Sequence, residues 1–360
     1  MYRFALPVLL FLGVLLAVYG CGGNDDNLEV AGWAIGFRMD GTAAIFHTAN
    51  GGVSWTEQGN PELWQGMNGN DISAVDAWTA WAALGDEANN EGIILHTTDG
   101  GATWKSQTLP DSVNDPVKGI KGLSRAVAWA VTLGGTVMRT LDGGKTWDVV
   151  PHEGVTINQV NRMDARGDDI WIADVGSGNQ GMIHSSDFGL TWRKEQLPED
   201  VMPMDGPMCV SIVNSRVAWA AVRPEADVYR TLDGGDNWNL DAPNITAPND
   251  IDDICAVGED IAWAAQNIDD SGNIIRVRMV DGKAVCDVMD PMHNNYHFEG
   301  ITCFNENNLW VVGFKAFGAA ESLPLGVILH TRDGGKTWIS QKVPANDVNL
   351  WKVSFAGAFR

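Results

Sequence analysis

Residues 139–147 read RTLDGGKTW, and this nine-residue box recurs along the chain. The other copies are HTANGGVSW (47–55), HTTDGGATW (96–104), HSSDFGLTW (184–192), RTLDGGDNW (230–238) and HTRDGGKTW (330–338). A degenerate copy that lacks the tryptophan, RMVDGKAV, occupies 278–285. Copies at one regular spacing predict a chain built from similar units of about 40–50 residues.

A tryptophan within a short apolar segment precedes each box. These residues are Trp33, Trp81, Trp129, Trp171, Trp219, Trp263 and Trp310, at intervals of 42 to 48 residues. Repeats of this length with strand-like content are typical of β-propellers, which arrange four-stranded sheets around a central channel. The sequence therefore predicts an all-β, seven-bladed β-propeller with four-stranded antiparallel blades.

Each unit is expected to contain four strands in one order: inner strand A, the tryptophan-bearing strand B, strand C that ends at the box, and outer strand D. The first unit has no room for a strand A before Trp33. Residues 349–355, NLWKVSF, read as a strand A with no successors. We therefore expect the C-terminal strand to complete the first blade, which removes an open sheet edge.

The box has a structural interpretation. Its aspartate is expected to accept hydrogen bonds from backbone N–H groups two or three residues later, and its glycines supply positive φ angles. Its tryptophan is expected to pack back on its own hairpin. The residues assigned this structural role are Asp99, Trp104, Asp142, Trp147, Asp187, Trp192, Asp233, Trp238, Asp333 and Trp338.

The T-x-D-G-G-x-T-W segments resemble the Asp-boxes, or BNR repeats, of bacterial neuraminidases. Together with the W-A-x-G strands, they make residues 30–360 most similar to the photosystem II stability/assembly factor family of seven-bladed propellers. The resemblance implies a propeller that helps to build a membrane complex. It carries over no binding residue, because the family members linked to photosystem II are thought to present a basic patch, whereas this chain has a net charge of -22.

The N-terminus has the pattern of an export signal. A short basic start precedes an apolar run from Phe4 to Tyr19, which is too short to span a membrane as a helix. Val18-Tyr19-Gly20-Cys21 resembles a bacterial lipobox. We expect a lipoprotein signal peptide at 1–20, a lipidated Cys21, a tether at 21–29 and the propeller at 30–360. An ordinary cleaved signal with a chance cysteine is the alternative.

Charge and composition exclude one class of partner. An acidic surface repels phosphate backbones, so we expect no nucleic-acid binding.

The spacing of Cys209, Cys255, Cys286 and Cys303 matches no zinc pattern, and their disulfide state is open. Three of them fall in equivalent strands, where small buried residues are expected. Asp269-Asp270-Ser271-Gly272-Asn273 has oxygen ligands and a glycine, as calcium loops do, but lacks the full calcium-loop spacing, so calcium binding is open. His293 and His297 would share a face only on a helix, and we expect no cofactor and no metal ion.

Irregular loops between strands B and C and between strands D and A are expected to share one face. Loops on a rigid scaffold often carry binding residues. The candidates on this face are Trp64, Asp86, Glu87, Glu225, Asp269, Asp270, His293, Tyr296 and His297.

The sequence leaves two hypotheses for the function of the chain. The favoured one is a non-catalytic, lipid-anchored scaffold of the cell envelope, on the outer membrane in a Gram-negative host, which binds an envelope or membrane protein. The alternative is an Asp-box glycoside hydrolase or carbohydrate-binding protein. A sialidase would need a tyrosine nucleophile, and only Tyr229 and Tyr296 remain after the signal. The GFRMD segment at 36–40 departs from the F-R-I-P motif, although two carboxylates alone suffice for other glycosidases.

Overall fold

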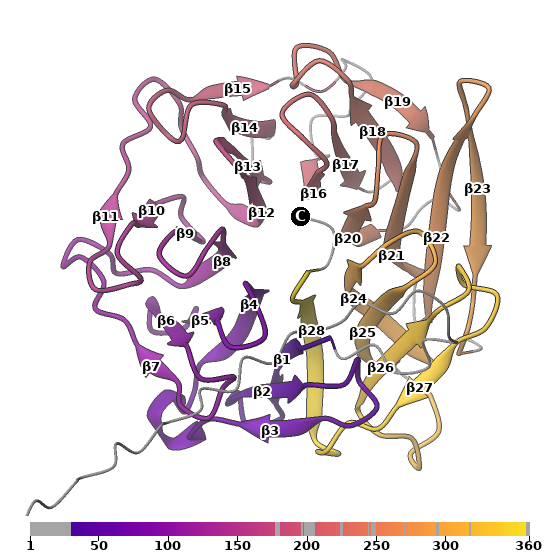
Figure 1. Ribbon diagram of the computed structural model, residues 1–360, viewed down its shortest axis with the longest axis horizontal. Helices are drawn as coiled ribbons and strands as arrows, with labels where there is room; N and C mark the ends of the chain where they lie inside the picture. Colours follow the sequence, from indigo (N-terminus) through magenta and orange to yellow (C-terminus); the bar gives the residue numbers. More distant parts are fainter. Residues whose placement is uncertain are drawn as a thin grey trace, which may run out of the picture.

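Seven four-stranded antiparallel sheets surround a central axis like the blades of a propeller (Figure 1), which confirms the predicted fold class. The computed structural model describes residues 30–176, 181–195, 197, 206–223, 226–243, 245, 250–268, 271–292, 295–316 and 318–357. No helix within these ranges is long and apolar enough to cross a bilayer. One 3-10 turn, η1 (Pro61–Trp64), lies between blades 1 and 2.

The strands of blades 1 to 7 follow the predicted order from the channel outward. The A strands are β28 (Val348–Phe355), β4 (Asn68–Ala74), β8 (Val117–Gly122), β12 (Val160–Arg166), β16 (Gly206–Ile212), β20 (Asp250–Ala256) and β24 (Tyr296–Cys303). The B strands are β1 (Gly32–Arg38), β5 (Ala80–Asp86), β9 (Ala128–Thr132), β13 (Asp169–Asp174), β17 (Ala218–Arg223), β21 (Ile261–Ile268) and β25 (Leu309–Lys315). The C strands are β2 (Ala43–Thr48), β6 (Glu91–Thr97), β10 (Val137–Thr140), β14 (Gly181–Ser185), β18 (Asp227–Thr231), β22 (Ser271–Val280) and β26 (Gly326–Thr331). The D strands are β3 (Thr56–Gln58), β7 (Lys105–Ser106), β11 (Asp148–Val149), β15 (Arg193–Glu195), β19 (Asn239–Ala242), β23 (Lys283–Met289) and β27 (Ile339–Gln341).

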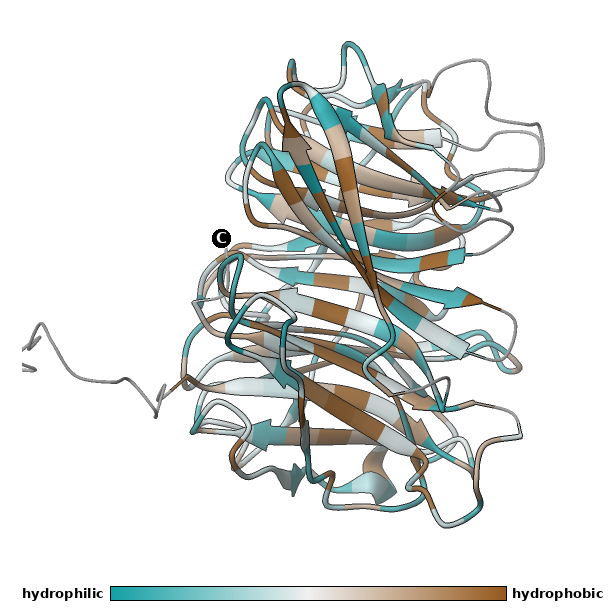
Figure 2. Cartoon of the chain, turned by 90° about the vertical axis from the view of Figure 1, so that its right-hand side faces the viewer, coloured by the Kyte–Doolittle hydropathy of each residue, from teal (hydrophilic) through white to brown (hydrophobic). Residues whose placement is uncertain are grey.

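The two ends of the described chain meet in blade 1. Strand β28 pairs antiparallel with β1, so that Gly32 lies opposite Phe355 and Trp33 lies opposite Ser354. The C-terminal strand therefore completes the first blade, as predicted. Seen edge-on, the strands run between two opposite faces of the disc (Figure 2). The loop face carries the B–C and D–A connections, and the Asp-box face carries the A–B turns and the boxes.

Every blade contains the same pair of stacked side chains between strands B and C. The B-strand tryptophan lies opposite a histidine or an arginine, as in the pairs of Trp81 with His96 and Trp219 with Arg230. The indole of Trp81 and the imidazole of His96 are parallel, with ring centroids 3.5 Å apart. These C-strand residues therefore share one repeated structural position.

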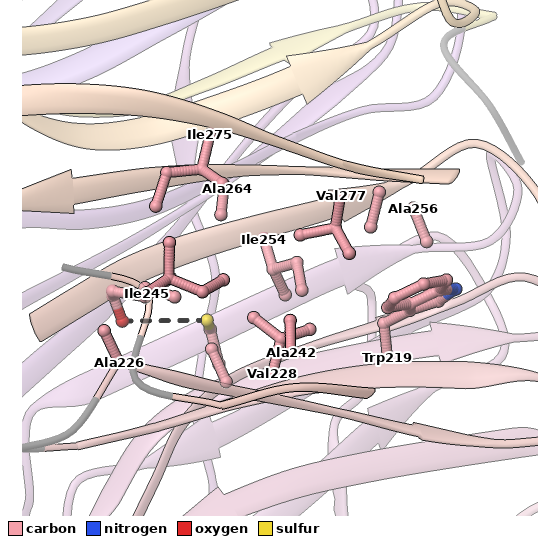
Figure 3. Close-up of a cluster of buried hydrophobic side chains, with 14 of the residues drawn as sticks. Trp219, Ala226, Val228, Ala242, Ile245, Ile254, Ala256, Ala264, Ile275 and Val277 are labelled. Carbon is pink, nitrogen blue, oxygen red and sulfur yellow. Dashed lines mark hydrogen bonds between the residues drawn. The ribbon is translucent and has the colours of Figure 1, made fainter. Parts of the chain in front are cut away.

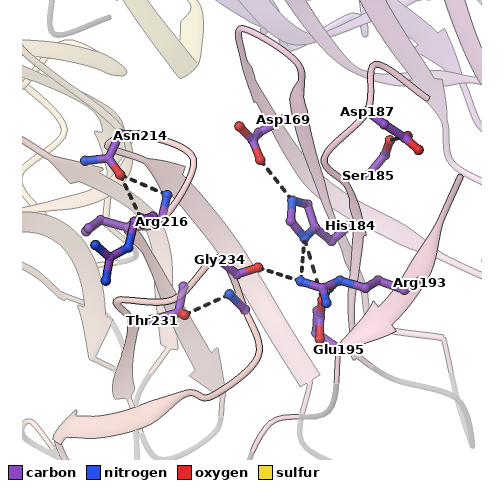
Figure 4. Close-up of polar contacts among 12 residues, drawn as sticks. Asp169, His184, Ser185, Asp187, Arg193, Glu195, Asn214, Arg216, Thr231 and Gly234 are labelled. Carbon is purple, nitrogen blue, oxygen red and sulfur yellow. Dashed lines mark hydrogen bonds and ion pairs between the residues drawn. The ribbon is translucent and has the colours of Figure 1, made fainter. Parts of the chain in front are cut away.

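Blade 4 adds charged partners to this pair (Figure 4). The buried His184 stacks on Trp171, and its Nε2 lies 3.2 Å from Asp169 Oδ1. Its Nδ1 lies 3.6 Å from Glu195 Oε1. Burial opposes a charge on His184, but the hydrogen bonds with Asp169 and Glu195 outweigh it and raise the histidine pKa.

Each aspartate box closes by a fixed set of hydrogen bonds. In the last box, Asp333 Oδ1 accepts from the Thr337 amide at 2.9 Å, and Asp333 Oδ2 accepts from the Thr337 hydroxyl at 2.6 Å. The Thr331 hydroxyl donates to Asp333 and accepts from the Gly335 amide. The aspartate therefore mainly serves an amide and a hydroxyl four residues later, and the Lys336 amide three residues later contributes less. These bonds lower the pKa of Asp333 to about 2.

The box tryptophan also contacts the preceding blade, a contact that the sequence did not predict. Trp147 of blade 3 meets Trp81 of blade 2 edge-on, with ring centroids 5.7 Å apart. Trp238 of blade 5 meets Trp171 of blade 4 in the same way. Buried aliphatic side chains complete the contacts between blades, as in the cluster around Ile254 and Val228 between blades 5 and 6 (Figure 3).

Candidate functional site

The inner strands line the channel with a recurring bulge. In every A strand the pairing with strand B skips one residue, so equivalent positions can be compared around the ring. The residues that follow the bulge, called the charged ring here, are Lys352, Asp71, Gly119, Arg162, Cys209, Asp253 and Gly300 in blades 1 to 7. Four charged side chains thus share the ring with three small residues.

Carboxylates of the channel tie some blades to the next. Asp71 Oδ2 accepts from the Ile120 amide at 2.9 Å, and Asp253 Oδ2 accepts from the Ile301 amide at 2.9 Å. Inner strands have one edge without a sheet partner, so these bonds satisfy amides that would otherwise remain unpaired. Burial raises the pKa of Asp71, although Lys352 acts in the opposite direction.

An ion pair crosses the ring from blade 1 to blade 6. Lys352 Nζ lies 2.6 Å from Asp253 Oδ1, and both side chains are largely buried. Blade 7 lies between them and contributes Gly300 at this level. A Cβ at Gly300 would come within 2.6 Å of the Trp351 carbonyl oxygen, so glycine permits the close approach of β24 and β28.

Arg162 occupies the ring opposite this pair. Its side chain is buried, with 7% of the residue exposed, and its Nε has no hydrogen-bond partner among the described residues. Burial opposes its charge, but the carboxylates of Asp253, Asp71 and Glu299 outweigh this effect and raise its pKa. The guanidinium is therefore held in the channel by the field of several carboxylates rather than by one ion pair.

The channel mouth on the loop face is defined here as three of the bulged residues, Lys118, Asp252 and Glu299, together with Asn267 of strand β21. The Asn267 amide nitrogen lies 2.7 Å from Asp252 Oδ2 and 3.2 Å from Glu299 Oε1, so it joins two carboxylates of neighbouring blades. Burial raises the pKa of Asp252 to about 6, although the charge of Arg162 acts in the opposite direction. Burial and the charge on Asp252 raise that of Glu299 to about 8.

A cavity of about 320 Å³ occupies the other half of the channel, toward the Asp-box face. Its wall contains Ser73, Lys121, Asp164 and Ser211, which follow the charged ring along their strands. Lys121 Nζ and Asp164 Oδ1 are 2.7 Å apart. Positive and negative groups are thus paired inside the cavity, whereas carboxylates accumulate at the mouth.

Two of the predicted loop-face residues are buried. Trp64 and Tyr296 are each 2% exposed. Trp64 Nε1 donates to the Ala43 carbonyl at 3.0 Å, and the Tyr296 hydroxyl donates to the Pro324 carbonyl at 3.3 Å. Both side chains anchor the chain internally, so in this structure neither presents its ring to a partner.

The other described candidates reach the surface. Asp86 accepts from the amides of Ala88 and Asn89 and thereby closes the β5–β6 turn. Glu87 is well exposed, with its Oε1 3.9 Å from Lys118 Nζ of the channel mouth. His297 is half-buried and stacks on Phe314. Glu225, Asp269, Asp270 and His293 lie outside the described residues.

The tyrosines do not form a sialidase-like centre. Tyr229 is 1% exposed in the middle of β18, where it packs between blades 4 and 5. Since Tyr296 is also buried, neither hydroxyl is placed to attack a sugar substrate.

Comparison with known proteins places the chain in a family. The family model described as photosynthesis system II assembly factor YCF48 matches residues 27–177 and 128–278, which together exceed half of the chain. The chain belongs to this YCF48 family. No curated protein matches it in sequence.

Solved structures share the fold of this YCF48-family chain. A structure of YCF48 bound to a D1 peptide is 18% identical with a TM-score of 0.56, and the match covers 79% of this chain and 90% of that one. YCF48 from Cyanidioschyzon merolae is 16% identical with a TM-score of 0.57, covering 80% and 95%. A protein from Lactobacillus plantarum is 13% identical with a TM-score of 0.60, covering 91% and 99%. At these identities the likeness concerns the fold.

Proposed function

We propose that this YCF48-family propeller is a non-catalytic assembly scaffold of the cell envelope, and that its loop face holds a basic peptide segment of a membrane protein. Family membership supports the scaffold role. The structure of YCF48 with a D1 peptide is an example of a propeller in this family that holds a peptide.

The observation that carries the choice of ligand is the carboxylate pair at the channel mouth. Asp252 and Glu299 share one amide, and their pKa values are raised because burial and nearby carboxylates oppose their ionisation more than Arg162 favours it. A lysine or arginine side chain placed between them would relieve this repulsion. Glu87 at the rim and the net charge of -22 favour the approach of a basic segment.

The proposed lipid anchor fits this arrangement. We propose that residues 1–20 are a signal peptide, that Cys21 is acylated, and that 21–29 form the tether to the propeller at 30–360. Val30 lies on the Asp-box face, since its carbonyl accepts from the Gly51 amide of the first box at 2.9 Å. An anchor joined there would turn the Asp-box face toward the membrane and leave the loop face open to a partner.

Fluorescence anisotropy with two labelled twelve-residue peptides, one rich in lysine and arginine and one rich in aspartate and glutamate, tests the proposal. The protein should bind the basic peptide, and the double variant D252N/E299Q should bind it at least tenfold more weakly. E306Q, an equivalent neutralisation on the Asp-box face, should bind within twofold of wild type. Preference for the acidic peptide, or equal binding by both variants, would contradict the proposal.

A further inference from the structure

Two cysteines meet where neighbouring blades are joined. In three other blades, a serine two residues after the charged ring ties one inner strand to the next. Ser73 Oγ accepts from the Gly122 amide, Ser211 Oγ from the Ala256 amide and Ser354 Oγ from the Ala74 amide, all at 3.0 Å. Between blades 6 and 7 the equivalent acceptor is a sulfur atom, because Cys255 takes the place of the serine.

The partner at this junction is also a cysteine. The Cys303 amide donates to Cys255 Sγ at 3.0 Å, and the Cys303 thiol donates to the Cys255 carbonyl at 3.5 Å. At the position of Cys303 the other blades carry Ala74, Gly122, Ala165, Ile212, Ala256 and Phe355. Hence the three channel cysteines occupy three different positions along their strands, and among them Cys255 and Cys303 are hydrogen-bonded to each other.

The two thiols differ in their access to solvent. Cys255 is half-buried and lines the 320 Å³ cavity, through which a small reagent can approach. Cys303 is buried, with no exposed surface. Burial raises the pKa of the Cys303 thiol well above its usual value, and its hydrogen bond with the Cys255 thiol raises it further. A half-buried attacking thiol that a reagent can reach, beside a buried second thiol, is an arrangement suited to stepwise oxidation.

We propose that Cys255 and Cys303 form a disulfide that joins blades 6 and 7 when the protein meets a disulfide oxidant, such as a small dialkyl disulfide or a thiol–disulfide oxidoreductase. The Cys255 thiolate attacks one sulfur of the oxidant, which forms a mixed disulfide and releases the first thiol. The Cys303 thiolate then attacks Cys255 Sγ and displaces the second thiol. The two protein thiols lose two electrons and two protons, and the oxidant is reduced to two thiols.

Such a bond would replace the hydrogen-bonded tie with a covalent one. It would close a loop of the chain between positions 255 and 303 and constrain the unfolded state, so oxidation should raise Tm by several degrees. In a cell the reaction requires an oxidising compartment, which the proposed export would provide. The chemistry in vitro does not depend on peptide binding, so the two proposals fail separately.

The test uses the full-length chain in a C21S background, treated with hydroxyethyl disulfide and then unfolded in denaturant with N-ethylmaleimide. The maleimide adducts, counted by mass, give the number of free thiols, and peptide mapping identifies the linked cysteines. We expect four thiols before treatment and two after it, with one linked peptide pair containing Cys255 and Cys303. C255S, which restores the serine of other blades, should retain Cys303 as a thiol. C303A should retain one mercaptoethanol adduct on Cys255.

C286S serves as the control, because Cys286 lies on the outer strand β23; it should form the same bond as wild type and show the same rise in Tm. The proposal is overturned if wild type keeps four thiols, if it keeps a mixed disulfide at Cys255, or if mapping links any other pair of cysteines.

Discussion

The Phe355 ring stacks on the Trp310 indole with centroids 3.8 Å apart, and it meets Trp55 edge-on at 5.9 Å. Phe355 belongs to the last strand, Trp310 to blade 7 and Trp55 to the first box. One aromatic side chain near the C-terminus therefore fills the junction between blades 7 and 1. Its ring also covers Gly32, where any Cβ would lie 2.5 Å from it.

Removal of this ring should open the closure. F355A should lower the free energy of unfolding by about 3–5 kcal/mol, because the buried aromatic leaves a cavity. Deletion of residues 347–360 should lower the free energy of unfolding further, since it exposes the edge of β1. Chemical denaturation measures both. L190A, at a leucine that is 80% exposed, is the matched truncation and should change stability little. A deletion that melts within a few degrees of wild type would refute the role of β28.

The box aspartates should affect stability and spare binding. D333A removes the acceptor for the Thr337 amide and hydroxyl, so it should lower the free energy of unfolding by roughly 1–3 kcal/mol. Affinity for the basic peptide should remain within twofold of wild type, because the box lies on the opposite face. A loss of binding with unchanged stability would point to a direct functional role for these carboxylates.

Glu299 should make the protein less stable as the pH rises. Its folded pKa of about 8 exceeds the usual glutamate value, so between pH 4.5 and 8 the folded state binds more protons than the unfolded state. Stability is lost across this window and levels off above it. The cost is of the order of a few kcal/mol, at about 1.4 kcal/mol for each tenfold change in proton affinity.

E299Q remains neutral, so its stability relative to wild type should increase from pH 5 to pH 9 in urea unfolding experiments. E306Q, at an exposed glutamate, should follow the wild-type curve. An E299Q protein that is less stable than wild type at pH 9 would show that the charge of Glu299 contributes favourably.

His96 should have the opposite effect and make the protein less stable as the pH falls. Burial, with a smaller effect of Lys105, lowers its pKa to about 4, so between pH 6.5 and 4 the unfolded state binds more protons. Stability is then lost as the pH falls through this window, by up to about 3 kcal/mol. H96F keeps a ring against Trp81 and should show a shallower acid loss. Equal slopes for the two proteins would mean that His96 is protonated in the folded state.

The repeats made the blade number, strand order and closure predictable, because Trp33 and its six equivalents mark strands whose burial the fold requires. The box contacts were predicted less well. Bonds from Asp333 to a residue four positions later, and the contact of Trp147 with the preceding blade, depend on three-dimensional geometry that a repeat unit does not reveal. Their roles within the fold could be inferred, but their partners could not.

The channel mouth was missed for a different reason. The sequence DIDDI at 250–254 and the glutamate in FEGI at 298–301 place charges within apolar strands, and that contrast was the available signal. The bulge that turns Asp252 and Glu299 into the channel has no sequence signature of its own. Loop composition directed attention instead to Trp64 and Tyr296, which burial removes from the surface.

Photo-crosslinking in cells tests the central claim, which is that the loop face receives a partner protein. The full-length chain would carry p-benzoylphenylalanine at Glu87 on the loop face or at Glu306 on the Asp-box face. We expect a discrete crosslinked species from position 87 that disappears in D252N/E299Q, and none from position 306. A crosslinked partner from position 306 alone, or a species from position 87 that persists in the double variant, would contradict the account.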